Sequence, residues 1–131
     1  MKYLFDVNAL VALGFLEHEF HRRLARWVST STPSIATCSI TELGFVRVLA
    51  QALDYGLTVH DARKLLQRLK AVDALQFTFL PDAHDVTHLP TWVKTPRQLT
   101  DGHLLQLAKA RSMGLATLDR KIPGAYMIPE L

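Results

Sequence analysis

Four acidic residues that are far apart in the sequence could together hold a hard cation. Asp6 and Asp119 each close a short apolar run, whereas Glu42 and Asp101 lie in the first turns of two amphipathic segments. Carboxylate oxygens are the ligands that Mg2+ and Mn2+ prefer. Carboxylates that are crowded together repel one another unless a divalent ion compensates their charge. These residue types therefore indicate a Mg2+ or Mn2+ site, provided that the fold brings them together.

The elements that must position these acids alternate between strand-like and helical patterns. The expected strands cover residues 2–6, 34–38, 76–80, 115–118 and 125–128. Apolar residues at helical spacing lie between them, and this alternation predicts an α/β fold with a mostly parallel sheet and right-handed crossovers. In such a sheet the carboxyl ends of the strands and the amino ends of the helices share one edge, where ligands bind. We expect all four acids at this edge.

Length and composition are those of one compact domain spanning residues 1–131. The chain is 49% hydrophobic, and its single cysteine, Cys38, excludes an intrachain disulfide and favours a reducing compartment. No apolar run approaches the length of a membrane span, and the acid at position 6 comes too early for a signal peptide. We therefore expect a cytoplasmic protein with no membrane association.

The charge distribution favours a polyanionic partner. The chain has 15 basic and 12 acidic residues, so if four acids are held at a metal site, eight remain against 15 basic residues. Arg120 and Lys121 directly follow Asp119 and are candidate nucleic-acid contacts. Arg47 is either a phosphate contact or a buried ion-pair partner.

Each of the four acids also has a simpler structural interpretation. Ser39 to Glu42 has the pattern of a capping box, in which Ser39 caps a helix and Glu42 reaches back to the backbone. Asp101 is favourable near a helix N-terminus whatever its function. Asp6 could cap the helix that follows it, and Asp119 could be an ordinary turn residue.

Position alone does not select these four acids, because Asp61 and Asp82 occupy comparable helix-start and strand-end positions. The order of the strands decides which acids meet. If the first and fourth strands are neighbours at the centre, Asp6 and Asp119 are adjacent. Asp82 is remote if the third strand lies at an edge.

Four short blocks carry the acids: Asp6–Leu10, Thr41–Arg47, Thr100–Leu105 and Ala116–Arg120. Taken together, in their order, spacing and total length, these blocks resemble the PIN-domain ribonucleases, particularly the VapC-type toxins of toxin–antitoxin pairs. The resemblance covers essentially the whole chain. The combined signature of four blocks is specific, although each block alone is not.

The resemblance implies a PIN-like three-layer α/β/α fold whose five-stranded parallel sheet has the order 3-2-1-4-5. It also implies a metal-dependent endoribonuclease with Asp6, Glu42, Asp101 and Asp119 around Mg2+ or Mn2+, acting as a homodimer and neutralised by a cognate VapB-type antitoxin. Asn8 and Thr117 match positions that support the acids, and Arg120, Lys121 and Arg47 become candidate RNA contacts. Gly102 stands where alanine is commoner, and we expect it to weaken the first turn of its helix by up to about 1 kcal/mol.

Two other classes of function compete with the nuclease. A phosphotransfer or phosphatase domain also places acids at strand ends and binds Mg2+, but it usually has paired acids or an Asp-x-Asp motif where this chain has Asp6-Val7-Asn8. A PIN-like module without catalysis could serve as an RNA-binding or protein-binding scaffold. The presence of all four acids argues against that second alternative.

Overall fold

The computed structural model describes all 131 residues, and its centre is a parallel sheet of five strands in the order β3-β2-β1-β4-β5. The strands are β1 (Lys2–Phe5), β2 (Ser34–Thr37), β3 (Phe77–Phe79), β4 (Gly114–Thr117) and β5 (Tyr126–Met127). All neighbouring strands pair in parallel. The predicted fold class and strand order are confirmed, and each strand lies where the apolar runs predicted it, with small differences at the ends.

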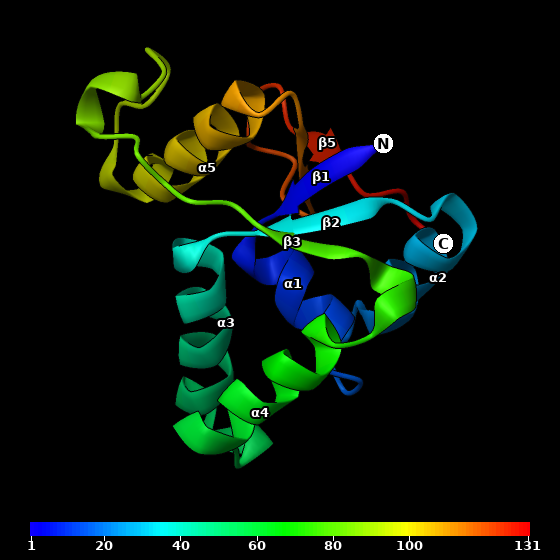
Figure 1. Ribbon diagram of the computed structural model, residues 1–131. Helices are drawn as coiled ribbons and strands as arrows, with labels where there is room; N and C mark the ends of the chain where they lie inside the picture. The colour runs from blue at the N-terminus through cyan, green and yellow to red at the C-terminus, as the bar shows by residue number, and fades with distance from the viewer.

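Five α-helices cover the two faces of this sheet. They are α1 (Val7–Gly14), α2 (His21–Ser31), α3 (Ser39–Gln51), α4 (Val59–Lys70) and α5 (Leu99–Ala110). Helix α5 lies on one face, and α1 to α4 lie on the other (Figure 1). None of these helices is both long enough and apolar enough to cross a lipid bilayer.

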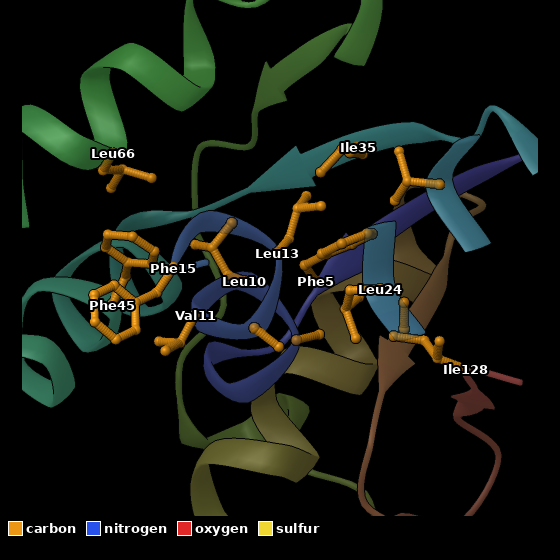
Figure 2. Close-up of a cluster of buried hydrophobic side chains, with 14 of the residues drawn as sticks. Phe5, Leu10, Val11, Leu13, Phe15, Leu24, Ile35, Phe45, Leu66 and Ile128 are labelled. Atoms are coloured by element: carbon orange, nitrogen blue, oxygen red, sulfur yellow. The ribbon is translucent and has the colours of Figure 1, made fainter. Parts of the chain in front are cut away.

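The central strand β1 divides the buried side chains into two clusters. Tyr3 and Phe5 point into a cluster of 18 buried residues that includes Leu10 of α1 and Phe45 of α3 (Figure 2). Leu4 points to the opposite face, into a cluster of 10 buried residues that contains the apolar side chains of α5. Because β1 is covered on both faces, the residue that follows it is held firmly at the edge of the sheet.

Helices α1 and α3 approach each other closely because of a glycine. Gly44 of α3 lies against Val7 of α1, and a Cβ atom at position 44 would overlap the Val7 side chain. The two helices start at the carboxyl ends of the neighbouring strands β1 and β2. Glycine at this contact therefore keeps their amino ends together, at the edge where the acids were expected.

Candidate active site

Asp6 is a buried carboxylate at the carboxyl end of β1, with 5% of its surface exposed. One oxygen, Oδ1, accepts a hydrogen bond from the Ala9 N–H at 2.8 Å, so Asp6 caps α1 as the capping interpretation predicted. The other oxygen, Oδ2, accepts from the hydroxyl of Thr117 at the end of β4. Asp6 is thus held at both oxygens, and the structural role and a site role do not exclude each other.

Thr117 connects two of the acids. Its hydroxyl donates to Asp6 and also accepts a hydrogen bond from the Asp119 N–H at 2.9 Å. Asp119 in turn accepts from the Lys121 N–H at 2.8 Å, which is the turn geometry expected for this residue. Thr117 is the buried last residue of β4, which pairs with β1. Its two hydrogen bonds therefore fix the distance between the segments that carry Asp6 and Asp119.

Two of the carboxylates, Asp6 and Asp101, have raised pKa values. Burial raises the pKa of Asp6 to about 6, against the opposing effect of hydrogen bonds from Thr117 and Ala9, and the charges of Asp101 and Asp119 raise it further. The pKa of Asp101, in the first turn of α5, is also raised, first by burial and then by Asp119. The structure therefore brings together Asp6, Asp101 and Asp119, which come from three separate parts of the sequence.

The capping interpretation of Glu42 is wrong. Helix α3 begins at Ser39, so Cys38 is its N-cap and Ser39 is already helical. The hydroxyl of Thr41 accepts from the Cys38 N–H at 3.0 Å and takes the place expected for the Glu42 side chain. The capping pattern is displaced by one residue, which leaves Glu42 available for other contacts.

Glu42 instead binds two groups, the Thr37 hydroxyl and the Lys70 ammonium. Its Oε2 accepts from the Thr37 hydroxyl at 2.6 Å and lies 2.6 Å from the Lys70 Nζ. The acids that raise the pKa of Asp6 are Asp101 and Asp119, and Glu42 is not among them. Nothing in the sequence pattern pointed to Lys70, the last residue of α4, as a partner of Glu42.

The carboxylate oxygens of this site are suitable ligands for a hard divalent cation, although the side chains do not surround one common position. No three His, Cys, Asp or Glu side chains are placed to hold a metal ion as they lie. The available donors are nevertheless all carboxylates, and their mutual repulsion is what a divalent cation would neutralise. Asp6, Asp101 and Asp119 could hold it, and Glu42 could join them after leaving Lys70.

The two competing acids do not join this cluster. Asp61 forms a reciprocal capping box with Thr58 at the start of α4, with both bonds at 3.0 Å. Asp82 follows β3, which is an edge strand, and it pairs with His103 of α5 and accepts from the His84 N–H at 2.9 Å. Asp82 thus reaches α5, but it pairs with a histidine two residues beyond Asp101.

Asn8 and the predicted basic residues are exposed, whereas Thr117 is buried. Asn8 and Asp119 line the same cavity, of about 330 Å³. Arg120 forms an exposed ion pair with Glu130, at 2.6 Å. Arg47 is exposed in a groove between α3 and α4, so the alternative of a buried ion pair is wrong for this residue.

Known proteins resemble this chain in sequence and in fold. The model of the PIN-domain family matches residues 3–126. Ribonuclease VapC38 of Mycobacterium tuberculosis is 40% identical over 119 residues, which are 88% of this chain and 84% of that protein. Ribonuclease VapC29 of the same organism is 34% identical over 126 residues, which are 91% of this chain and 86% of that protein.

A solved structure of VapBC2 from Rickettsia felis, bound to a DNA fragment from their promoter, has a chain with a similar fold. The TM-score is 0.61, and the match covers 97% of both chains. Sequence identity is 14%, so this comparison bears on the fold alone.

Proposed function

This chain belongs to the PIN-domain family, and from that membership we propose that it is a VapC-type endoribonuclease that uses Mg2+ or Mn2+ to hydrolyse RNA phosphodiester bonds. The observation that carries this proposal is the convergence of Asp6, Asp101 and Asp119 within electrostatic range at one edge of the sheet. The ribonuclease relatives, which match nearly the whole chain, support the same activity.

In the proposed mechanism, the carboxylates bind the cation and Thr117 keeps two of them in place. A bound divalent ion would activate water and neutralise negative charge at the phosphate. Asp6 has a fixed position because both of its oxygens accept hydrogen bonds, whereas Asp101 lies in the first turn of a separate helix, α5. The main contributions of the protein are positioning and electrostatic stabilisation, and no side-chain nucleophile is required.

We propose that the RNA backbone contacts the exposed basic residues around the acids. Arg120 and Lys121 directly follow Asp119, and both are exposed. The ion pair between Arg120 and Glu130 is solvated, with side chains 75% and 64% exposed, so it does little to hold Arg120 away from a phosphate. Arg47 is a more distant contact on α3.

An antitoxin of the VapB type is the proposed protein partner, and the groove between α3 and α4 is a suitable place for it. This groove has a volume of about 650 Å³ and exposes Leu43 and Val59, which are 63% and 56% accessible. Arg47, Arg63 and Lys70 also line it. A segment with apolar and acidic residues would match this surface, and an arginine from the same partner would pair with the acids. A cytoplasmic homodimer is part of the same proposal.

The direct test is to incubate the purified protein with total RNA and Mg2+ or Mn2+ and to map the ends of the products. We expect 5′-phosphate and 3′-hydroxyl ends, because water and not the ribose 2′-hydroxyl attacks phosphorus. EDTA and the variant Asp6→Asn should abolish cleavage. Asp61→Asn is the matched control, since it neutralises a carboxylate outside the cluster and should cleave normally. Products with 2′,3′-cyclic phosphates would contradict the mechanism.

A further inference from the structure

A cavity of about 310 Å³ lies against the first turn of α5 and has no part in the mechanism proposed above. Its walls come from the start of α3, from α5 and from the loop 80–98, and include Ile40, His84, Val86, Leu89, Leu99 and His103. Thr100 also lines it, so two lining residues of α5 flank Asp101. The cavity therefore adjoins the helical turn that carries one of the proposed metal-binding acids.

One nitrogen of the lining residue His84 lacks a partner. The Nδ1 of His84 is buried and makes no hydrogen bond, and it is the only buried side-chain nitrogen or oxygen in this condition. Buried polar atoms are nearly always paired, because an unpaired one loses its bonds to water without replacement. Because neighbouring atoms cover this nitrogen, a ligand in the cavity reaches it only after a half-turn of the His84 ring about its Cβ–Cγ bond, which keeps the ring plane. The nitrogen can then donate or accept according to the tautomer.

The rings around this atom are held in place by their neighbours. The His84 ring stacks on His88 with a centroid distance of 4.3 Å, and it meets the His103 ring edge-on at 6.4 Å. Asp82 pairs with His103 and accepts from the His84 backbone N–H, while Asp85 lies 3.3 Å from His88. These contacts hold the planes of the His84 and His103 rings in a defined orientation at the cavity.

Gly102 allows the loop to pack against α5 at this point. A Cβ atom at position 102 would overlap Val93 and would lie 3.4 Å from Pro90, both in the loop 80–98. The expected effect of Gly102 was only a weaker first turn. The structure supplies a reason for the glycine, which is the close approach of the loop that carries His84 and His88.

We propose that this cavity binds one unpaired nucleobase of the RNA substrate, next to the bond that is cut, and that the His84 ring turns so that its Nδ1 pairs with the base edge. The proposal rests on the ribonuclease function proposed above. Apolar walls and imidazole rings suit a flat heterocycle, and unstacked bases are commonly bound by stacking and edge hydrogen bonds. A phosphate is disfavoured here, because Asp85 lines the cavity and no lysine or arginine does.

Nucleotide binding without metal tests this proposal independently of catalysis. The six histidines give separate Cε1–H signals in NMR spectra, and each of the four nucleoside 5′-monophosphates can be titrated in EDTA, with ribose 5-phosphate as the control without a base. We expect base-dependent shifts at His84, His88 and His103, with little change at the other three. No shift at His84, His103 and the stacked His88, or the same shifts with ribose 5-phosphate, would overturn the base pocket.

His84→Phe separates stacking from hydrogen bonding, because phenylalanine keeps a ring beside His88 but lacks the nitrogen. We expect the dissociation constant of the preferred nucleotide to rise roughly tenfold and the preference among bases to disappear. His60→Phe, on the exposed start of α4, is the matched control, and melting curves verify that both variants fold. A preference that survives His84→Phe would contradict the proposal. Base-dependent shifts in a protein that cleaves no RNA would contradict the ribonuclease function while supporting the pocket.

Discussion

The Lys70 ammonium lies 2.6 Å from the Glu42 carboxylate, so the charge of one proposed metal ligand is compensated within the protein. The two residues occupy the end of α4 and the start of α3, and the Thr37 hydroxyl donates to the same Glu42 oxygen. Lys70 also lies 5.6 Å from the centre of the Phe79 ring. The acids are therefore unequal, since Glu42 has a cationic partner within bonding distance and Asp6, Asp101 and Asp119 form no ion pair.

Replacing Lys70 should strengthen metal binding. In Lys70→Met the Glu42 carboxylate loses its cation, so we expect Mn2+ to bind up to about fivefold more tightly, the range that a partly exposed ion pair allows. Titration of free Mn2+ by electron paramagnetic resonance measures this change. Lys64→Met removes an exposed charge elsewhere on α4 and is the control. An unchanged or weaker affinity in Lys70→Met would place Glu42 outside the metal site.

The metal-free protein should lose stability as the pH rises from about 4 to about 6. Burial raises the pKa of Asp6 from 3.8 to about 6, so the folded protein binds a proton that the unfolded chain releases. The stabilisation is complete below the unfolded pKa and is lost as the pH passes the folded one, with a full value of roughly 3 kcal/mol. Urea unfolding in EDTA across this range measures it.

Asp6→Asn is the control for this pH dependence, because asparagine can still cap α1 but does not titrate. Carboxylates with a lowered pKa, such as Asp85 bonded by Thr87, contribute stability that is already complete above about pH 4 and is lost only at lower pH. They do not compensate for Asp6 within the measured range. Equal slopes in the wild type and in Asp6→Asn would show that Asp6 ionises normally.

Asp101→Asn should separate stability from metal binding. Its pKa is raised by burial and by Asp119, so neutralising it relieves repulsion, and the metal-free variant should be as stable as the wild type or more stable at neutral pH. The thermal shift produced by Mn2+ should shrink and cleavage should stop. Melting curves with EDTA and with Mn2+ measure both effects. A simple helix-end carboxylate would instead lose about 0.3–1 kcal/mol and leave the Mn2+ shift unchanged.

Removing the two basic residues after Asp119 should weaken RNA binding through charge. For the double variant Arg120→Ala and Lys121→Ala, the slope of log affinity against log salt should become shallower by about 0.7 per lost phosphate contact. Fluorescence anisotropy with labelled single-stranded RNA in EDTA gives this slope. The exposed pair Arg22 and Arg26 on α2 supplies a comparison with equal loss of charge. An identical change in both double variants would indicate general charge attraction without a local contact.

Gly102→Ala should destabilise the protein although alanine is the better helix former. Overpacking against Val93 should cost about 1–3 kcal/mol, more than the gain of up to about 1 kcal/mol in helix propensity. Val93→Ala should restore part of the loss when the two changes are combined. Urea unfolding of the four proteins in a double-mutant cycle measures the coupling. Additive effects would mean that the loop does not constrain position 102.

The features that could be predicted from sequence are those set by alternation and by strand ends. Short apolar runs placed the strands, and each run that ends in an acid put that acid at one edge, as Asp6 and Asp119 show. The prediction of a capping box from Ser39 to Glu42 was wrong because the helix begins one residue earlier, with Cys38 as the N-cap and Thr41 as its partner.

Contacts between elements could not be predicted in the same way. The pairing of Lys70 with Glu42 depends on the lengths and packing of two antiparallel helices. The spacing of apolar residues predicts each helix but not which residues of two helices meet. The path of the loop 80–98 depends on its packing at Gly102, and a segment without periodicity carries no signal for that path. The histidine-lined cavity was therefore visible only in three dimensions.

The division of the interior by β1 implies that the site spans two parts of the molecule with different resistance to local unfolding. Asp6 is anchored beside the cluster of 18 buried residues, whereas Asp101 lies on α5, whose apolar side chains belong to the cluster of 10. Transient opening of α5 would withdraw Asp101 while the rest of the sheet stayed intact, and its amide protons should exchange before those of α1. A cation bound by both acids would therefore hold α5 against the rest of the sheet and slow this local opening.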